Sequence, residues 1–102
     1  MSRRLYLGEK RYVGMTVSRR DDEAFTIAGA SFEVKDAAGA VVESGTASVD
    51  DNQVFFLFDT TKTSGTPAAA LYAAGRSYKA WFAVTITGLG KLLKEYVLVE
   101  IT

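Results

Sequence analysis

The side chains of this sequence that could do chemistry are almost all carboxylates, because the chain contains neither histidine nor cysteine. Without those residues it can build no Ser-His or Cys-His nucleophile pair, no thiolate metal site and no disulfide. Asp36, Asp50, Asp51 and Asp59 remain as candidates for an acid–base pair. Each lies in or beside an expected turn, where aspartate usually accepts hydrogen bonds from the local backbone. We therefore predict no catalytic residue and no enzyme activity.

Two short segments have the composition of ligand sites without the required context. Asp50-Asp51-Asn52 offers oxygen ligands for calcium but lacks the spaced ligands of a calcium loop. Gly88-Leu89-Gly90-Lys91 has the glycines and lysine of a phosphate loop, yet no helix is expected after it. Both segments are interpreted as turns, so the sequence predicts no metal site and no cofactor.

Composition limits the class of protein. The chain has 102 residues, enough for one domain over residues 1–102, with 12 basic and 12 acidic residues and no net charge. That balance argues against a nucleic-acid partner. The apolar residues after Arg3 and Arg4 are interrupted at once by charged residues, unlike a signal peptide, and no run approaches the roughly 20 apolar residues of a membrane span. We expect no membrane partner.

Alternating apolar residues predict an all-β fold. The expected strands are at residues 6–7, 12–18, 25–35, 41–49, 53–59, 78–87 and 92–101. Val13, Met15 and Val17 are expected to face inward, as are Val54, Phe56 and Phe58 of a later strand, whereas Gly45 suggests a bulge. Thr66, Pro67, the alanines and Gly75 predict one short helix at 67–74. About seven strands with a helix in the crossover before the penultimate strand fit a Greek-key β-sandwich.

The last two strands are expected to form a hairpin with a four-residue loop at Gly88–Lys91. In this register Trp81 lies opposite Leu98, Ala83 opposite Tyr96, and Lys79 opposite Glu100. A three-residue loop would lose the opposite-charge pair, so the first register is favoured.

The hairpin also predicts an interaction surface. Trp81, Ala83, Tyr96 and Leu98 fall together on its outer face, and large aromatic side chains on an open sheet suit a protein interface. The alternative is that these cross-strand pairs only stabilise the sheet. Tyr78, at the start of its strand, is either a tyrosine whose hydroxyl bonds to the backbone of the corner or a plain core residue.

Several stretches resemble an immunoglobulin-like β-sandwich of bacteriophage and prophage structural proteins. They are Tyr6-Leu7-Gly8-Glu9, the run IAGASFEV from Ile27 to Val34, the run DAAGAVV from Asp36 to Val42, and Ala74-Gly75-Arg76-Ser77-Tyr78. The chain departs from antibody domains because it has no cysteine pair and its tryptophan comes late. The resemblance implies a non-enzymatic structural or assembly module, an accessory subunit of a phage head, neck or tail.

The partners and the location follow from that resemblance. It implies protein partners, either further copies of the chain or other virion subunits, and a location in the virion or in the bacterial cytoplasm during assembly. A carbohydrate or cell-surface binding module is the alternative, with Trp81, Tyr96 and Tyr12 forming a platform on which sugars stack.

Overall fold

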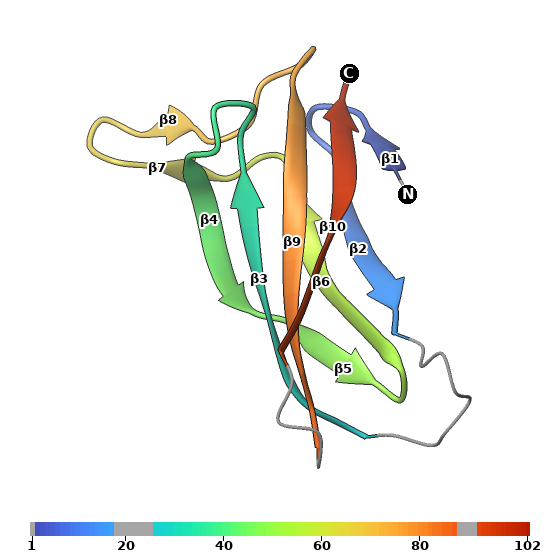
Figure 1. Cartoon of the computed structure of the whole chain (residues 1–102). Coiled ribbons are helices and arrows are strands. Elements are labelled where there is room, and N and C mark those ends of the chain that lie inside the picture. The colour runs from blue at the N-terminus through green and yellow to red at the C-terminus, as the bar shows by residue number, and fades with distance from the viewer. Residues whose placement is uncertain (1, 18–25, 88–91) are drawn as a thin grey trace.

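The computed structural model describes residues 2–17, 26–87 and 92–102, and every regular element in these ranges is a β-strand. The larger sheet has five strands in the order β1 (Ser2–Leu5), β10 (Leu92–Ile101), β9 (Ser77–Ile86), β3 (Ile27–Lys35) and β4 (Val41–Thr46). The smaller has three, in the order β2 (Lys10–Thr16), β6 (Gln53–Asp59) and β5 (Ser48–Asp50). Strands β7 (Thr63–Ser64) and β8 (Ala69–Ala70) form a separate hairpin that projects from one side (Figure 1).

The all-β, immunoglobulin-like sandwich is confirmed by this strand order. An immunoglobulin domain of the variable type pairs strands G, F, C and C′ in one sheet, and places strands B, E and D in the facing sheet. Here β10, β9, β3 and β4 form the first group, and β2, β6 and β5 form the second. Strand β1 adds to the edge of the larger sheet, parallel to β10.

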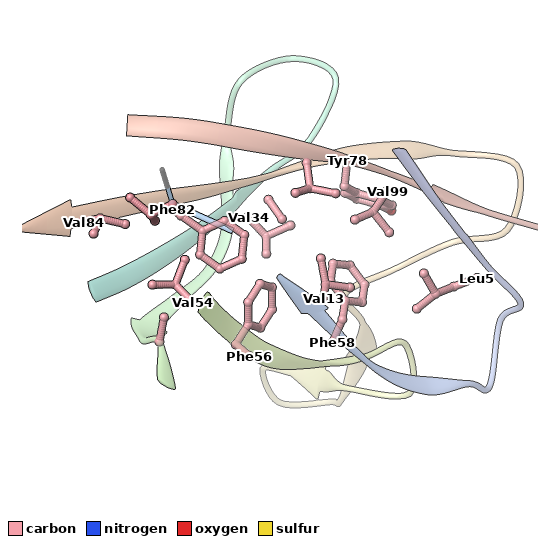
Figure 2. Packing of buried hydrophobic residues seen from close by; sticks show 14 of the residues in the cluster. Leu5, Val13, Val34, Val54, Phe56, Phe58, Tyr78, Phe82, Val84 and Val99 are labelled. Carbon is pink, nitrogen blue, oxygen red and sulfur yellow. The ribbon is translucent and has the colours of Figure 1, made fainter. Parts of the chain in front are cut away.

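The core lies between the two sheets and is built by strand alternation (Figure 2). The inward trio of β6, Val54, Phe56 and Phe58, is buried as predicted. In β2, Val13 is fully buried and Met15 packs against the core. The larger sheet contributes a buried row from β9, namely Tyr78, Ala80, Phe82, Val84 and Ile86, together with Val34, Val97, Val99, Ile101 and Leu5.

The strands predicted at 6–7 and 41–49 differ most from the structure, while the strand predicted at 12–18 lies two residues earlier, at Lys10–Thr16. The first strand ends at Leu5, which is buried, whereas Tyr6 and Leu7 are exposed in the turn that follows. The predicted strand 41–49 is divided between the two sheets, since β4 pairs with β3 and β5 pairs with β6. The chain crosses over at Ala47, which is 5% exposed and donates its N–H to the carbonyl of Ala30. Gly45 forms no bulge; it lies opposite Phe32, whose ring covers it.

The predicted helix at 67–74 is wrong. The segment contains a cis Thr66–Pro67 peptide bond and the β7–β8 hairpin instead. A helix this short has little stability of its own, so tertiary contacts decide its structure. The deciding contact is Tyr72, which is 2% exposed and packs its ring 4.6 Å from that of Phe58.

A polar cluster fixes the base of the β7–β8 hairpin to β4. The hydroxyl of Tyr72 donates a hydrogen bond to Glu43 Oε1, and Lys62 Nζ lies 2.8 Å from Glu43 Oε2. The N–H of Leu71 donates to the carbonyl of Lys62. Burial, followed by the hydrogen bond to the Glu43 carboxylate, raises the pKa of Tyr72 far above its ordinary value.

Tyr78 bonds to the backbone of the corner that precedes β9. Its hydroxyl oxygen accepts a hydrogen bond from the N–H of Ala73 at 3.1 Å, while its ring is buried against Tyr72. Of the two interpretations of Tyr78, the structure supports the corner tyrosine. The predicted hairpin loop Gly88–Lys91 lies outside the described residues.

A matched pair of glycine substitutions tests the packing of β2 on β6. A Cβ atom at Gly14 would lie 2.4 Å from the carbonyl oxygen of Val54, whereas one at Gly29 would meet nothing within 4 Å. We expect Gly14→Ala to lower the unfolding free energy by about 1–3 kcal/mol, because the strands must separate. Gly29→Ala is the control and should stay within about 0.5 kcal/mol of the parent in urea unfolding. Equal effects of the two variants would contradict this register.

The Tyr72 hydroxyl predicts a loss of stability at alkaline pH. Its folded pKa is raised, so its contribution is complete below the unfolded value of 10.0 and is lost as pH rises above that value. The unfolding free energy of the parent should fall by up to about 1.4 kcal/mol per pH unit more steeply than that of Tyr72→Phe. Urea titrations between about pH 8 and pH 11.5 measure the two slopes. Parallel slopes would show that the hydroxyl does not remain protonated in the fold.

Candidate functional site

The four aspartates considered as acid–base candidates do not form a site. Asp36 Oδ1 accepts hydrogen bonds from the N–H groups of Ala38 and Ala40 at 3.0 and 2.9 Å. Hydrogen bonds from the hydroxyl and N–H of Thr61 hold the pKa of Asp59 below its ordinary value. Asp50 ends β5, and Asp51 occupies the turn that follows, with a φ of 55°. Within the described ranges, no three or more His, Cys, Asp or Glu side chains gather as metal ligands would.

The predicted interface residues do gather on one face. On β9, Trp81 and Ala83 alternate with the buried Phe82, and on β10 Tyr96 and Leu98 flank the buried Val97. All four therefore face away from the core, as predicted.

The register of these strands differs from the predicted one by two residues. Trp81 lies opposite Tyr96, and Lys79 lies opposite Leu98 rather than Glu100. A shift of two residues keeps every side chain on its own face, so the burial pattern could not distinguish the two registers. The ion pair used to choose between them is not formed, because Glu100 pairs instead with Arg4 of β1 at 3.6 Å.

An aromatic pair occupies the centre of this outer face. The rings of Trp81 and Tyr96 lie 4.8 Å apart at an angle of 51°, and Tyr96 is 45% exposed. Lys79 Nζ sits 4.9 Å from the centre of the Tyr96 ring, within the range of a cation–π interaction. The pair is thus held in place by its neighbours while one side stays open to solvent.

Two hollows flank Trp81. The first, of about 670 Å³, lies over β4, β3, β9 and β10 and is lined by side chains that include Ser31, Glu33, Ala83 and Lys94. The second, of about 400 Å³, lies nearer the start of β9, where Lys79 and Leu98 meet the turn at Asp36. Trp81 and Lys35 line both hollows. The two hollows therefore form one trough with Trp81 as a ridge between them, named the Trp81 trough below.

Sequence reasoning missed the contribution of β3 to this trough. Ser31, Glu33 and Lys35 lie opposite Ala83, Trp81 and Lys79 of β9. Their polar alternation with Phe32 and Val34 indicated an outward face. Nothing in that pattern showed that β3 would pair with β9, since the two strands are separated by about 50 residues of sequence.

The predicted sugar platform of Trp81, Tyr96 and Tyr12 is wrong. Tyr12 belongs to β2 in the smaller sheet, where its ring makes an edge contact with Phe55 at 5.6 Å. Leu57, 43% exposed, lies opposite Tyr12 on the same outer face. Because the two sheets pack through their inner faces, Tyr12 and Trp81 lie on opposite sides of the sandwich.

Comparisons with known proteins support the fold only. No protein family model matches this sequence, and no curated protein matches it. A search of solved structures matches the chain to CopC from Methylosinus trichosporium OB3b, with 16% identity and a TM-score of 0.56. The match covers 98% of this chain and 84% of that one.

This match corrects the family expected from sequence. The similar structure is CopC and not a phage or prophage structural protein, so the predicted virion accessory function is wrong. The location in a virion, or in the cytoplasm during assembly, rested on the same resemblance and is wrong with it. The quoted motifs are strand alternations and Asp/Gly turns that many β-sandwiches share, which is why they identified the fold and not the family.

No helix among the described residues is long and apolar enough to cross a membrane.

Adjacent residues of β9 test the assignment of faces. Trp81 lies on the outer face and Phe82 is 0% exposed in the core. Trp81→Ala should cost about 0.5–1.5 kcal/mol of unfolding free energy, because it loses the Tyr96 contact. Phe82→Ala should cost about 3–5 kcal/mol, because it leaves a cavity. Thermal and urea unfolding measure the stability of both variants. A larger loss of stability for Trp81→Ala than for Phe82→Ala would show that the inner and outer faces of β9 are assigned the wrong way round.

Proposed function

We propose that this chain is a protein-recognition domain that binds an extended polypeptide segment in the Trp81 trough. The observation on which the proposal rests is the position of Trp81, a large aromatic side chain placed between two hollows on an open sheet face. Tryptophan and tyrosine dominate the binding energy of many protein interfaces, because they bury a large area with few rotatable bonds.

The contacts around Trp81 favour binding over simple stabilisation of the sheet. A tryptophan needed only for cross-strand packing would be served by a flat face, whereas here the surface is hollowed on both sides of the ring. Tyr96 packs against the Trp81 ring from one side and is itself covered by Lys79, so little side-chain freedom would be lost on binding. The Trp81 trough is therefore preorganised for a ligand that places side chains on both sides of the ridge.

The outer face of the smaller sheet is less suited to binding than the Trp81 trough. Exposed Tyr12 and Leu57 form an apolar group with half-buried Phe55 on β2 and β6. The hollow beside them, of about 420 Å³, is lined largely by polar groups that include Arg3, Thr16, Asp50 and Gln53. Tyr12 lines this hollow but neither of the two beside Trp81, so it provides a matched control for Trp81.

A selection from a random peptide library tests the proposal. Peptides selected for binding to the parent chain are resynthesised, and their dissociation constants are measured for the parent, Trp81→Ala and Tyr12→Ala. We expect micromolar binders whose affinity falls about tenfold or more with Trp81→Ala, as for an interface hot spot, and by less than about twofold with Tyr12→Ala.

The outcomes separate the two faces and self-association. Binders that depend on Tyr12 and not on Trp81 would place recognition on the smaller sheet and contradict the proposal, as would a library that yields no binder. Light scattering of the parent and of Trp81→Ala identifies the case in which a second copy supplies the segment. A defined oligomer that dissociates in Trp81→Ala would make the chain its own partner at the same trough.

A further inference from the structure

The dimensions of the Trp81 trough set the spacing of side chains that it can take. Ala83 lines the first hollow and Lys79 the second, and they lie four positions apart on the same face of β9. A strand rises about 3.3 Å per residue, so Ala83 and Lys79 lie about 13 Å apart along the sheet. In an extended ligand, side chains i and i+4 also share a face at that separation. One would enter each hollow, and the side chain at i+2 would lie over Trp81.

The charges around the trough favour an acidic ligand. Lys94 lines the first hollow, Lys79 the second, and Lys35 both. Only two carboxylates line the same surface, and both have local partners. Glu33 lies 3.4 Å from Lys35, and Asp36 accepts hydrogen bonds from its own turn. The trough thus has an excess of positive charge in a chain whose overall formal net charge is zero.

Lys79 is held where it can meet a ligand. Its ammonium group lies over the Tyr96 ring, and the residue lines the second hollow. Lys79 is exposed, so its ammonium group is accessible to a ligand carboxylate next to the apolar face of the Tyr96 ring. Apolar anchors and carboxylates can therefore be recognised together.

We propose that the ligand of the Trp81 trough is an extended acidic segment with two apolar or aromatic side chains four residues apart. This inference rests on the proposed function and specifies the class of segment bound. It requires both anchors on one face of the ligand and carboxylates between and around them. A basic segment, or one with its anchors on opposite faces, is rejected.

Three synthetic peptides with capped ends test the inference. The first, EEFETEFEE, has the required charge and spacing, and KKFKTKFKK has the opposite charge. EEFETFEEE has the same composition as the first, but its phenylalanines are three positions apart and so lie on opposite faces of a strand. Trp81 is the chain's single tryptophan, so its fluorescence reports binding at the trough directly. We expect the first peptide to bind at least about tenfold more tightly than either control.

Charge reversal in the chain provides the reciprocal test. Lys79→Glu and Lys94→Glu should each weaken the binding of EEFETEFEE about fivefold or more. Each should also reduce the preference for this peptide over KKFKTKFKK. Lys10→Glu is the control, since Lys10 lies on β2 and pairs with Asp59 at 3.8 Å. Raising the salt concentration should weaken the binding of the acidic peptide to the parent chain.

The outcomes distinguish this inference from the proposed function. If library peptides bind through Trp81 but are neutral or basic, the proposed function stands and the acidic specificity is overturned. Equal binding of EEFETEFEE and EEFETFEEE would overturn the spacing. If no peptide of either kind binds through Trp81, both proposals fail. Circular dichroism of each variant confirms that the sandwich is intact before binding is measured.

Discussion

Contact between the two sheets depends on the stacking of Phe32 on Phe56. The two rings, one from each sheet, lie 3.8 Å apart with an angle of 2° between their planes. Phe56 also contacts Phe82 of the larger sheet, and Phe58 continues the row to Tyr72 at the base of the projecting hairpin. These rings require β3, β6 and β9 to turn one face inward. Because every second residue is committed to the core, the side chains between them are left to form the outer surfaces.

Much of the fold was predictable because burial follows a period of two along a strand. The inward residues of β6 and β9 and the outward placement of Trp81 and Tyr96 required no knowledge of the partner strand. The same reasoning could not find the correct hairpin register. Registers that differ by two residues bury the same side chains, and the ion pair of Glu100 is made with β1, at the far end of the sequence.

Other features depend on contacts that local sequence does not contain. The alanines before Gly75 suit a helix, yet the burial of Tyr72 and its hydrogen bond to Glu43 favour a hairpin there. The transfer of the chain between sheets at Ala47 likewise depends on pairing with β3 and β6. For the Trp81 trough, the alternation of apolar residues along β9 and β10 was enough to predict the outward position of its aromatic residues. That Glu33 and Lys35 also line the trough could not be predicted, because it depends on the pairing of β3 with β9.

The parallel pairing of β1 with β10 has a consequence for biosynthesis. Ser2 lies opposite Leu98, so the two partners are separated by about 96 residues of sequence. At a synthesis rate of roughly 5–20 residues per second, β1 emerges from the ribosome roughly 5–20 s before the strand that pairs with it. During that interval its N–H and C=O groups are open to other strands. Two of its four residues, Arg3 and Arg4, are exposed arginines, and their charge opposes edge-to-edge association of nascent chains until β10 arrives.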